Sequence, residues 1–282
     1  MGSIKYLSFT ILFLLASNLY SQNILYAELK NKNWDIYSFS LKNGITKRMT
    51  KNSLKDFQSD YSNAQNKIVF DSYRDKNTRN IFTLNIQNKK ITQLTALQSR
   101  DGHPVWSSNG SRIAFQSSRT GDSEVFIMDS RGKKIQQMTF SNGFDGIPKW
   151  SPDDKLLAFN SSRSGSPNIY TIDLKSKETH QITSDSSSSF VQDWISQTEI
   201  LIITTVSERR QMQVLDIKSN KRINIKTEGN VTYARCNKNN EIVFTQKATT
   251  GEVNVFLINP DGSNLRQLTN SKYEKRFPAF FK

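Results

Sequence analysis

Residues 145–183 read DGIPKWSPDDKLLAFNSSRSGSPNIYTIDLKSKETHQIT, and residues 101–139 read the closely similar DGHPVWSSNGSRIAFQSSRTGDSEVFIMDSRGKKIQQMT. Their alignment places Trp106 on Trp150, which gives a period of 44 residues. Each copy consists of short apolar runs separated by turns rich in Gly, Ser and Asp. A period of this size and composition is typical of a β-propeller in which each repeat forms one blade.

The same repeat extends along most of the chain. An apolar triplet recurs about once per period, and its copies begin at Ile24, Ile68, Ile113, Leu157, Leu201 and Ile242. Each triplet is followed by a turn, a second alternating segment, and a short segment that ends in Thr at Thr50, Thr95, Thr139, Thr183, Thr227 and Thr269. Alternation of this kind favours half-buried antiparallel strands joined by hairpins. The sequence therefore predicts six blades.

A fourth strand is predicted about seven residues before each triplet. Its expected centres are Tyr61, Trp106, Trp150, Trp194 and Arg235. The first unit has no room for this strand, whereas residues 276–281 end the chain with the same pattern. Pairing of these two segments would close the ring within one blade and leave no open sheet edge.

We therefore expect an all-β fold, a six-bladed β-propeller of four-stranded antiparallel blades. The propeller is expected to be a single domain over residues 22–282. Its blade units are expected near residues 22–53 plus 276–281, 54–98, 99–141, 142–185, 186–229 and 230–271.

The first 21 residues have the features of a secretory signal peptide. Lys5 precedes a mostly apolar run from Tyr6 to Ala16, and the small residue Ser21 stands before a cleavage point at Gln22. The apolar run is shorter than the roughly 18 residues of a membrane-spanning helix. We predict an exported protein, periplasmic or secreted, with no stable membrane insertion after cleavage. An uncleaved anchor is the alternative.

The composition indicates a basic protein without disulfides. The chain has 39 Lys and Arg against 25 Asp and Glu, a formal net charge of +14, and its one cysteine is Cys236. We expect a monomer that binds an acidic partner, either an envelope protein or an anionic cell-surface polymer, and no nucleic acid. The candidate basic contacts are Arg209, Arg210, Lys218, Lys221 and Arg222, although lysines that merely deter sheet pairing are the alternative.

Polar residues five positions before each strand centre are expected at one mouth of the central channel. These residues are Asp56, Asp101, Asp145, Ser189, Asn230 and Lys275, with His103 beside them. Asp56, Asp101 and Asp145 offer oxygen ligands that suit Ca²⁺, whereas turn caps or acceptors of backbone N–H groups are the alternative. Apart from this candidate calcium site we expect no cofactor, because His103 and His180 occupy different repeat positions.

A Ser-x-Arg pattern follows three of the triplets, at Arg74, Arg119 and Arg163. These arginines either bind an anionic ligand or have a structural role. A structural role is favoured, with each arginine paired to backbone carbonyls or to a repeated carboxylate such as Asp129 or Asp173.

The motifs Pro-x-Trp-Ser-Pro-Asp-Asp, Leu-Ala-Phe-x-Ser-x-Arg, Ile-Tyr-x-x-Asp and Gln-Ile-Thr, in residues 148–183, resemble the WD40-like (PD40) repeat of TolB-type propellers. The resemblance implies a non-catalytic binding or protein-interaction module of the bacterial cell envelope. The repeats begin near the predicted mature N-terminus, so the α/β domain that precedes the propeller in TolB is not expected.

The alternative function is a carbohydrate-active hydrolase or lyase that uses the carboxylates of the channel mouth. Oligogalacturonate lyases resemble this chain in their repeat but use a histidine cluster that it lacks. No Gly-x-Ser-x-Gly nucleophile motif occurs either. We therefore predict no catalytic residues.

Overall fold

Segments with alternating apolar residues form strands, and turns rich in Gly, Asn, Asp and Lys join them into hairpins. Residues 23–75, 78–96, 99–184 and 188–281, which this computed structural model describes, contain 24 strands and no helix. This part of the chain thus offers no apolar helix of membrane-spanning length. The predicted signal peptide, residues 1–21, lies outside the described residues.

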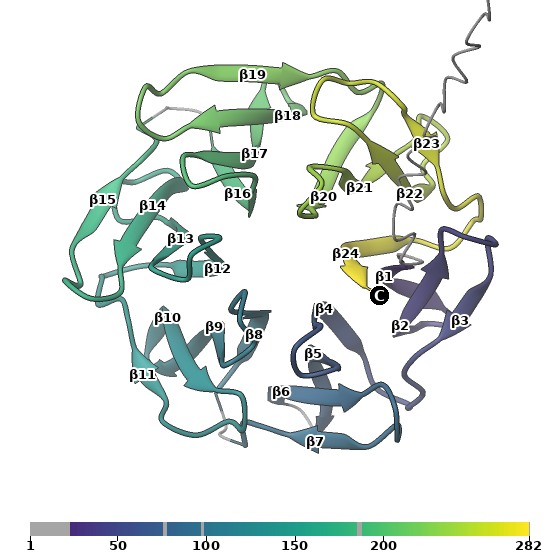
Figure 1. Cartoon of the computed structure of the whole chain (residues 1–282), viewed down its shortest axis with the longest axis horizontal. Helices are drawn as coiled ribbons and strands as arrows, with labels where there is room; N and C mark the ends of the chain where they lie inside the picture. The colour runs from purple at the N-terminus through teal and green to yellow at the C-terminus, as the bar shows by residue number, and fades with distance from the viewer. Residues whose placement is uncertain (1–22, 76–77, 97–98, 185–187, 282) are drawn as a thin grey trace, which may run out of the picture.

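The strands form six four-stranded antiparallel sheets that surround a central channel (Figure 1). The predicted all-β, six-bladed propeller is therefore confirmed. The first three blades are β24 (Lys275–Phe281), β1 (Asn23–Lys30), β2 (Asn33–Ser40) and β3 (Thr46–Arg48); β4 (Asp56–Ser62), β5 (Lys67–Asp75), β6 (Thr78–Asn85) and β7 (Ile91–Gln93); and β8 (Asp101–Trp106), β9 (Arg112–Thr120), β10 (Asp122–Asp129) and β11 (Gln136–Gln137).

The remaining three blades have the same order from the channel outward. They are β12 (Asp145–Trp150), β13 (Leu156–Ser161), β14 (Asn168–Asp173) and β15 (Thr179–Gln181); β16 (Ser189–Trp194), β17 (Glu199–Val206), β18 (Arg209–Asp216) and β19 (Arg222–Ile225); and β20 (Asn230–Cys236), β21 (Ile242–Lys247), β22 (Val253–Ile258) and β23 (Arg266–Gln267).

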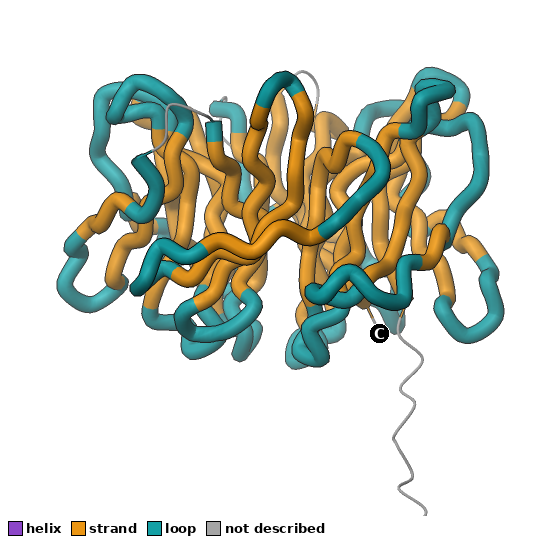
Figure 2. The backbone as a smooth tube through the Cα atoms, turned by 90° about the horizontal axis from the view of Figure 1, so that it is seen from above, coloured by secondary structure: helices purple, strands orange, loops and turns teal. Residues whose placement is uncertain are grey.

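In five blades the strand next to the channel is the one that precedes the apolar triplet, and in the first blade it is β24 (Figure 1). Because every blade has the same topology, the six inner strands run in the same direction along the ring axis. We call the face of the ring at which they begin the start face, and the opposite face the end face. In the side view the strands extend between the loops of these two faces (Figure 2).

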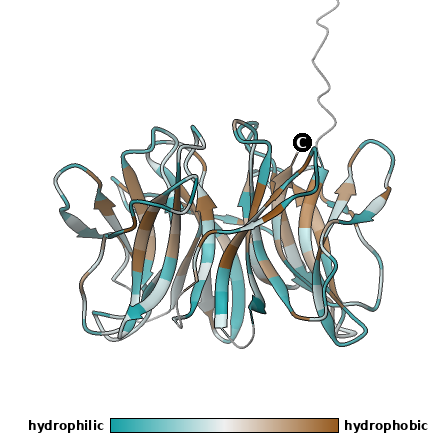
Figure 3. Cartoon of the chain, turned by 90° about the horizontal axis from the view of Figure 1, so that it is seen from below, coloured by the Kyte–Doolittle hydropathy of each residue, from teal (hydrophilic) through white to brown (hydrophobic). Residues whose placement is uncertain are grey.

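The hydrophobic core lies between neighbouring blades. Side chains alternate across each strand, so every apolar triplet contributes to the interfaces on both sides of its sheet. One cluster joins Val105 and Val125 of the third blade to Leu157 and Tyr170 of the fourth. Hydrophobic residues are concentrated in the strands, whereas the loops at both faces are mostly hydrophilic (Figure 3).

Antiparallel pairing of β1 with β24 closes the ring in the first blade. Asn23 lies opposite Phe281, and Leu25 lies opposite Ala279. Ile24 also packs in one cluster with Val243 of the sixth blade. The prediction that residues 276–281 complete the first blade is confirmed, and the strand begins one residue earlier, at Lys275.

The fifth and sixth blades differ by one residue from the predicted register. Trp194 lies opposite Ile200 as Trp150 lies opposite Leu157, so the fifth triplet begins at Ile200 and not at Leu201. In the sixth blade Cys236 lies opposite Ile242. Cys236, and not Arg235, therefore occupies the position of the repeated aromatic residue.

The predicted threonines explain how the short outer segments are held. In five blades the threonine hydroxyl accepts a hydrogen bond of 2.9–3.0 Å from the backbone N–H of the residue 14 positions earlier, at Thr50, Thr95, Thr139, Thr183 and Thr269. The prediction was wrong for Thr227. Ile225 already pairs with Met212 in β19, so Lys226 takes the position that threonine has elsewhere.

A Thr183→Val substitution is expected to lower the free energy of unfolding by about 1–3 kcal/mol. Valine has the shape of threonine but leaves the buried N–H of Ile169 and the Oδ1 of Asn168 without their partner. Chemical denaturation measures the change. Thr179→Val in the same outer segment is the control and is expected to change little, because Thr179 is only half-buried. Equal effects of the two substitutions would contradict this assignment.

Candidate functional site

The repeated arginines pair with the aspartates that begin the inner strands. Arg74 Nη2 lies 2.8 Å from Asp56 Oδ2, and Arg119 Nη2 lies 3.1 Å from Asp101 Oδ2. The same pair forms in the fourth blade at 2.5 Å, between Arg163 and Asp145. All three carboxylates are fully buried, and each guanidinium lies over aromatic rings of its own blade.

This geometry supports the structural role predicted for the arginines and corrects their partners. Asp129 accepts backbone N–H groups of its own turn and lies 3.5 Å from Arg131. Asp173 caps the equivalent turn in the next blade by accepting the backbone N–H groups of Lys175 and Ser176. Both carboxylates lie at the end face, where the hairpin turn needs acceptors, and so they do not meet the arginines of the start face.

The candidate calcium ligands are not brought together. Asp56, Asp101 and Asp145 belong to three different blades, and an arginine of the same blade compensates each carboxylate. Among the described residues no group of three or more His, Cys, Asp or Glu side chains is arranged to hold a metal ion. The observed geometry therefore gives no support to the calcium prediction.

Ser189 and Lys275, two more of the predicted mouth residues, are buried and bonded to other residues of the protein. Ser189 is buried and its hydroxyl bonds that of Thr204 at 3.2 Å. Lys275 is 1% exposed, and its ammonium donates to Ser271 Oγ and Tyr273 O, each at 2.7 Å. It also lies 3.6 Å from Glu28, so the first blade reverses the polarity of the repeated ion pair.

Asn230 does not occupy the predicted mouth position. The register of the sixth blade places the buried Val231 opposite Gln246, where the third blade has Asp101 opposite Ser117. Asn230 is exposed at the start of its strand, and its side chain accepts the backbone N–H of Arg210 at 3.0 Å. Five of the six predicted mouth residues therefore hold equivalent positions at the start of their inner strands, and Asn230 does not.

The predicted basic contacts divide between the two faces of the ring. Arg209 and Arg210 begin β18 at the start face, and both are exposed. Lys218 and Lys221 lie in the turn between β18 and β19, and Arg222 begins β19. This turn is at the end face because β18 begins at the start face and crosses the ring. One partner surface therefore cannot use all five.

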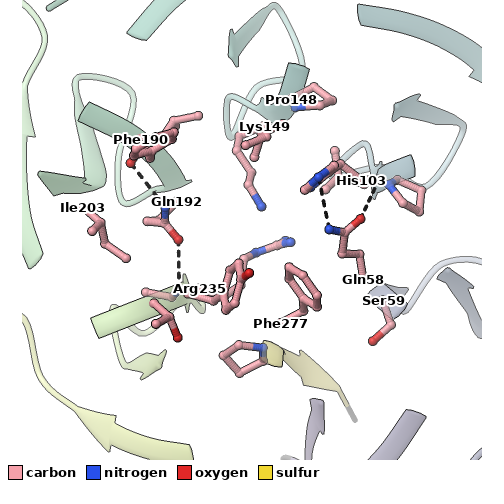
Figure 4. A pocket seen from close by; sticks show the side chains of 18 of the residues that line it. Gln58, Ser59, His103, Pro148, Lys149, Phe190, Gln192, Ile203, Arg235 and Phe277 are labelled. Carbon is pink, nitrogen blue, oxygen red and sulfur yellow. Dashed lines mark hydrogen bonds between the residues drawn. The ribbon is translucent and has the colours of Figure 1, made fainter. Parts of the chain in front are cut away.

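A cavity of about 310 Å³ occupies the channel on the side of the start face (Figure 4). Its wall includes the predicted residue His103 and also Arg210. The other side chains that define its chemistry are Gln58, Ile147, Lys149, Phe190, Gln192, Tyr233, Arg235 and Phe277. The site is thus an apolar and aromatic pocket with a few polar groups, which is the composition of small-ligand sites.

Bulges in the inner strands turn side chains toward this cavity. His103, Ile147 and Phe277 hold equivalent positions and have φ values of 52°, 57° and 54°. Positive φ is uncommon for residues other than glycine and is unfavourable for a β-branched residue such as Ile147. Bulges redirect side chains at functional sites. The backbone is therefore strained at the cavity wall itself.

The side chain of Gln58 determines which ring nitrogen of His103 carries the proton. Gln58 Oε1 accepts the backbone N–H of His103 at 3.0 Å, so Gln58 Nε2 donates to His103 Nε2 at 3.1 Å. Burial, with the positive charges of Arg79 and Lys149, holds the pKa of His103 well below its usual range. The imidazole is therefore neutral at pH 7 and carries its proton on Nδ1.

Six equivalent residues lie one position before the repeated aromatic position of the inner strands, and three of them, Val105, Lys149 and Arg235, line the inner end of the cavity. Each of the six lies opposite the second residue of its triplet, as Lys149 lies opposite Ala158. We call this set the floor ring, and it consists of Asp60, Val105, Lys149, Asp193, Arg235 and Ala279.

Arg235 crosses the floor ring. Its Nε donates to Asp193 Oδ2 at 2.8 Å, and its Nη2 donates to Asp60 Oδ1 at 3.0 Å across the small side chain of Ala279. Burial opposes the charge of Arg235, yet Asp193 and Asp60 together raise its pKa. Burial and then the nearby Arg235 lower the pKa of Lys149 to about 7, against the opposing effect of these two carboxylates.

Most of this site was not predicted from the sequence. Lys149, Asp60 and Asp193 were not singled out, and Arg235 was noted only as a strand centre. The signal was present, because charged residues stand immediately before Trp150 and Trp194, where the third blade has Val105. The differing residue types at this position concealed its equivalence.

Comparison with known proteins identifies similar sequences and folds. A sequence profile of the TolB β-propeller domain (PD40) matches residues 75–281. TolB from Acinetobacter baumannii superposes with a TM-score of 0.82 at 18% identity, and the alignment covers 92% of this chain and 66% of that chain. This chain therefore spans about two thirds of the length of that TolB. A search of curated proteins found no match.

Two further solved structures share the fold. A chain of the nidogen/laminin complex has a TM-score of 0.72 at 9% identity, with 92% of this chain and 98% of that chain covered. Oligogalacturonate lyase from Vibrio parahaemolyticus has a TM-score of 0.62 at 10% identity, with 86% and 73% covered. At such identities the likeness concerns the fold alone.

Proposed function

Because this chain belongs to the TolB β-propeller family, we propose that it is a non-catalytic binding module that holds a partner at the start face. The observation that carries the proposal is the contrast between two sets of polar groups. The repeated carboxylates are buried and paired with arginine, whereas the cavity at the start face is open and lined by aromatic and polar side chains. An open cavity with these side chains supports binding of a partner at the start face.

The charge of the start face favours an acidic partner. Arg210 lines the cavity and also a neighbouring depression that contains Lys247, Lys272 and Arg276 beside the acidic Glu252 and Glu274. Complementary charge speeds association, and this effect becomes weaker as salt screens the charges. The proposed partner is an envelope protein with an acidic face or an anionic cell-surface polymer, met by an exported, monomeric propeller. A chain of similar fold belongs to the nidogen/laminin complex, a precedent for protein binding on this scaffold.

Charge reversal at the start face is expected to reduce partner capture by about tenfold or more at moderate salt. The test compares capture from a cell-envelope extract by the wild type and by the double variant Arg209→Glu, Arg210→Glu. The matched control is Lys218→Glu, Lys221→Glu, which changes the net charge equally at the end face and is expected to keep capture. Equal losses in both variants would indicate nonspecific electrostatic capture and would contradict the proposal.

The alternative, a hydrolase or lyase acting on carbohydrate, would require one of the three repeated aspartates to react. Turnover of oligosaccharides by the wild type that is lost in an Asp101→Asn variant with an unchanged fold would favour this alternative. The buried pair of Asp101 with Arg119 argues against such a reaction.

A further inference from the structure

The cavity at the start face ends at the floor ring. Lys149 and Arg235 line this cavity and also line the depression on the end face, so their side chains lie between the two spaces. Both side chains extend toward the middle of the cavity in the close view (Figure 4). A ligand that enters from the start face therefore meets two cationic groups at its inner end.

Arg235 and Lys149 differ in their hydrogen-bond and ion-pair partners. Arg235 binds both carboxylates of the floor ring. The carboxylates also accept backbone N–H groups, Asp60 from Trp106 at 2.8 Å and Asp193 from Cys236 at 3.1 Å. The ammonium of Lys149, by contrast, has no hydrogen-bond partner within the part of the chain that the structure describes. A half-buried ammonium without a partner is available to donate hydrogen bonds to the acceptor atoms of a ligand.

The wall above Lys149 is apolar and aromatic. The rings of Tyr233 and Phe277 lie with their centroids 4.1 Å apart, and Ile147 and Phe190 line the same space. A volume of about 310 Å³ is at the lower end of the range for small-ligand sites. The cavity therefore combines a free cationic donor at its inner end with room for a compact apolar group.

We propose that this cavity binds a monocarboxylate with an aromatic or apolar body, the carboxylate at Lys149 and the body against Tyr233 and Phe277. The inference rests on the proposed binding function of the start face and specifies the ligand chemistry at its centre. A phosphate dianion fits less well, because Asp60 and Asp193 lie in the same ring and repel a second negative charge. A free small acid and the C-terminus of a peptide both present this carboxylate.

The first test titrates the full chain with 3-phenylpropionate and with the neutral 3-phenylpropanamide at pH 6, by calorimetry. The acid is expected to bind with a Kd of about 1 mM, the range for so small a ligand, and the amide about tenfold or more weakly. Lys149→Met is expected to remove this preference, and Lys149→Arg to retain part of it. Lys155→Met is the matched control in the same blade, since the Lys155 side chain is 77% exposed.

The pH dependence gives a readout that needs no variant. Lys149 must be protonated to bind the carboxylate, and its pKa is about 7. The affinity for 3-phenylpropionate is therefore expected to fall about tenfold between pH 6 and pH 8, as the protonated fraction falls. The affinity for the amide is expected to stay constant over the same interval.

The second arm compares acetyl-Gly-Gly-Phe with a free C-terminus and the same peptide as its amide. If only the peptide binds more tightly as the acid than as the amide, the natural ligand is a peptide C-terminus. If 3-phenylpropionate also binds more tightly than its amide, the ligand is either a free small acid or a peptide C-terminus. The proposal is overturned if neither acid binds at about 10 mM, if acid and amide bind equally, or if Lys149→Met keeps the preference. Partner capture that depends on Arg209 and Arg210 but not on Lys149 would sustain the binding function while rejecting this inference.

Discussion

Truncation of the chain after Glu274 is expected to lower the midpoint of thermal unfolding by about 15 °C or more. The truncation removes β24, whose Ala279 and Phe281 are buried in the core of the first blade. Loss of one buried phenylalanine side chain alone typically costs about 3–5 kcal/mol. The truncation also leaves β1 as an exposed edge strand that pairs only with β2, and it opens the ring, which favours aggregation.

Differential scanning calorimetry with light scattering measures both effects. Arg276→Ser is the control within β24, because the Arg276 side chain is 41% exposed and its pair with Glu274 lies at the surface. The control is expected to change stability by about 1 kcal/mol or less. A truncated chain that melts like the wild type would show that the ring does not depend on this strand.

Arg119→Met is expected to lower the free energy of unfolding by about 3–5 kcal/mol. The substitution leaves the fully buried carboxylate of Asp101 without the guanidinium that compensates its charge. Urea denaturation at pH 7 measures the loss. The double variant Asp101→Asn, Arg119→Met is expected to lose less than the single variant, because no uncompensated charge remains buried.

The matched control for this ion pair is Arg131→Met in the same blade. Arg131 lies 3.5 Å from Asp129, but its side chain is 74% exposed, so the pair is expected to contribute at most about 1 kcal/mol. Similar losses for Arg119→Met and Arg131→Met would contradict the assignment of the inner pair as a structural element of the blade.

The six blades were predictable because the features that define them repeat. The buried triplets recur at nearly constant spacing, and threonine holds the same position in five of the six blades. The Asp–Arg pairs were predictable in principle as well. The separation between Asp101 and Arg119 is 18 residues, and the pairs of the second and fourth blades have the same separation. The partners predicted from the sequence, Asp129 and Asp173, are C-terminal to their arginines, whereas the hairpin brings the N-terminal aspartate to each arginine.

The floor ring was not predictable in the same way, because its chemistry arises from differences between blades. Arg235 and Asp60 are 175 residues apart, and they meet only because the closed ring brings the second and sixth blades together across Ala279. The one-residue shift in the sixth blade also concealed the position of Arg235, since Cys236 replaces the aromatic residue that marks the register elsewhere. Periodicity identifies the scaffold, and departures from periodicity create the site.

The closure of the ring also determines how the molecule responds to mechanical tension. Asn23 and Phe281 lie opposite each other, so both described ends leave the same end of the β1–β24 pair. A force applied between these ends would load the backbone hydrogen bonds one after another from that end, and would peel the closing strand away. A force applied between loops of opposite blades would be distributed over the blade interfaces and would not load this pair first. The ring is therefore expected to open most easily when force is applied between the two described ends of the chain.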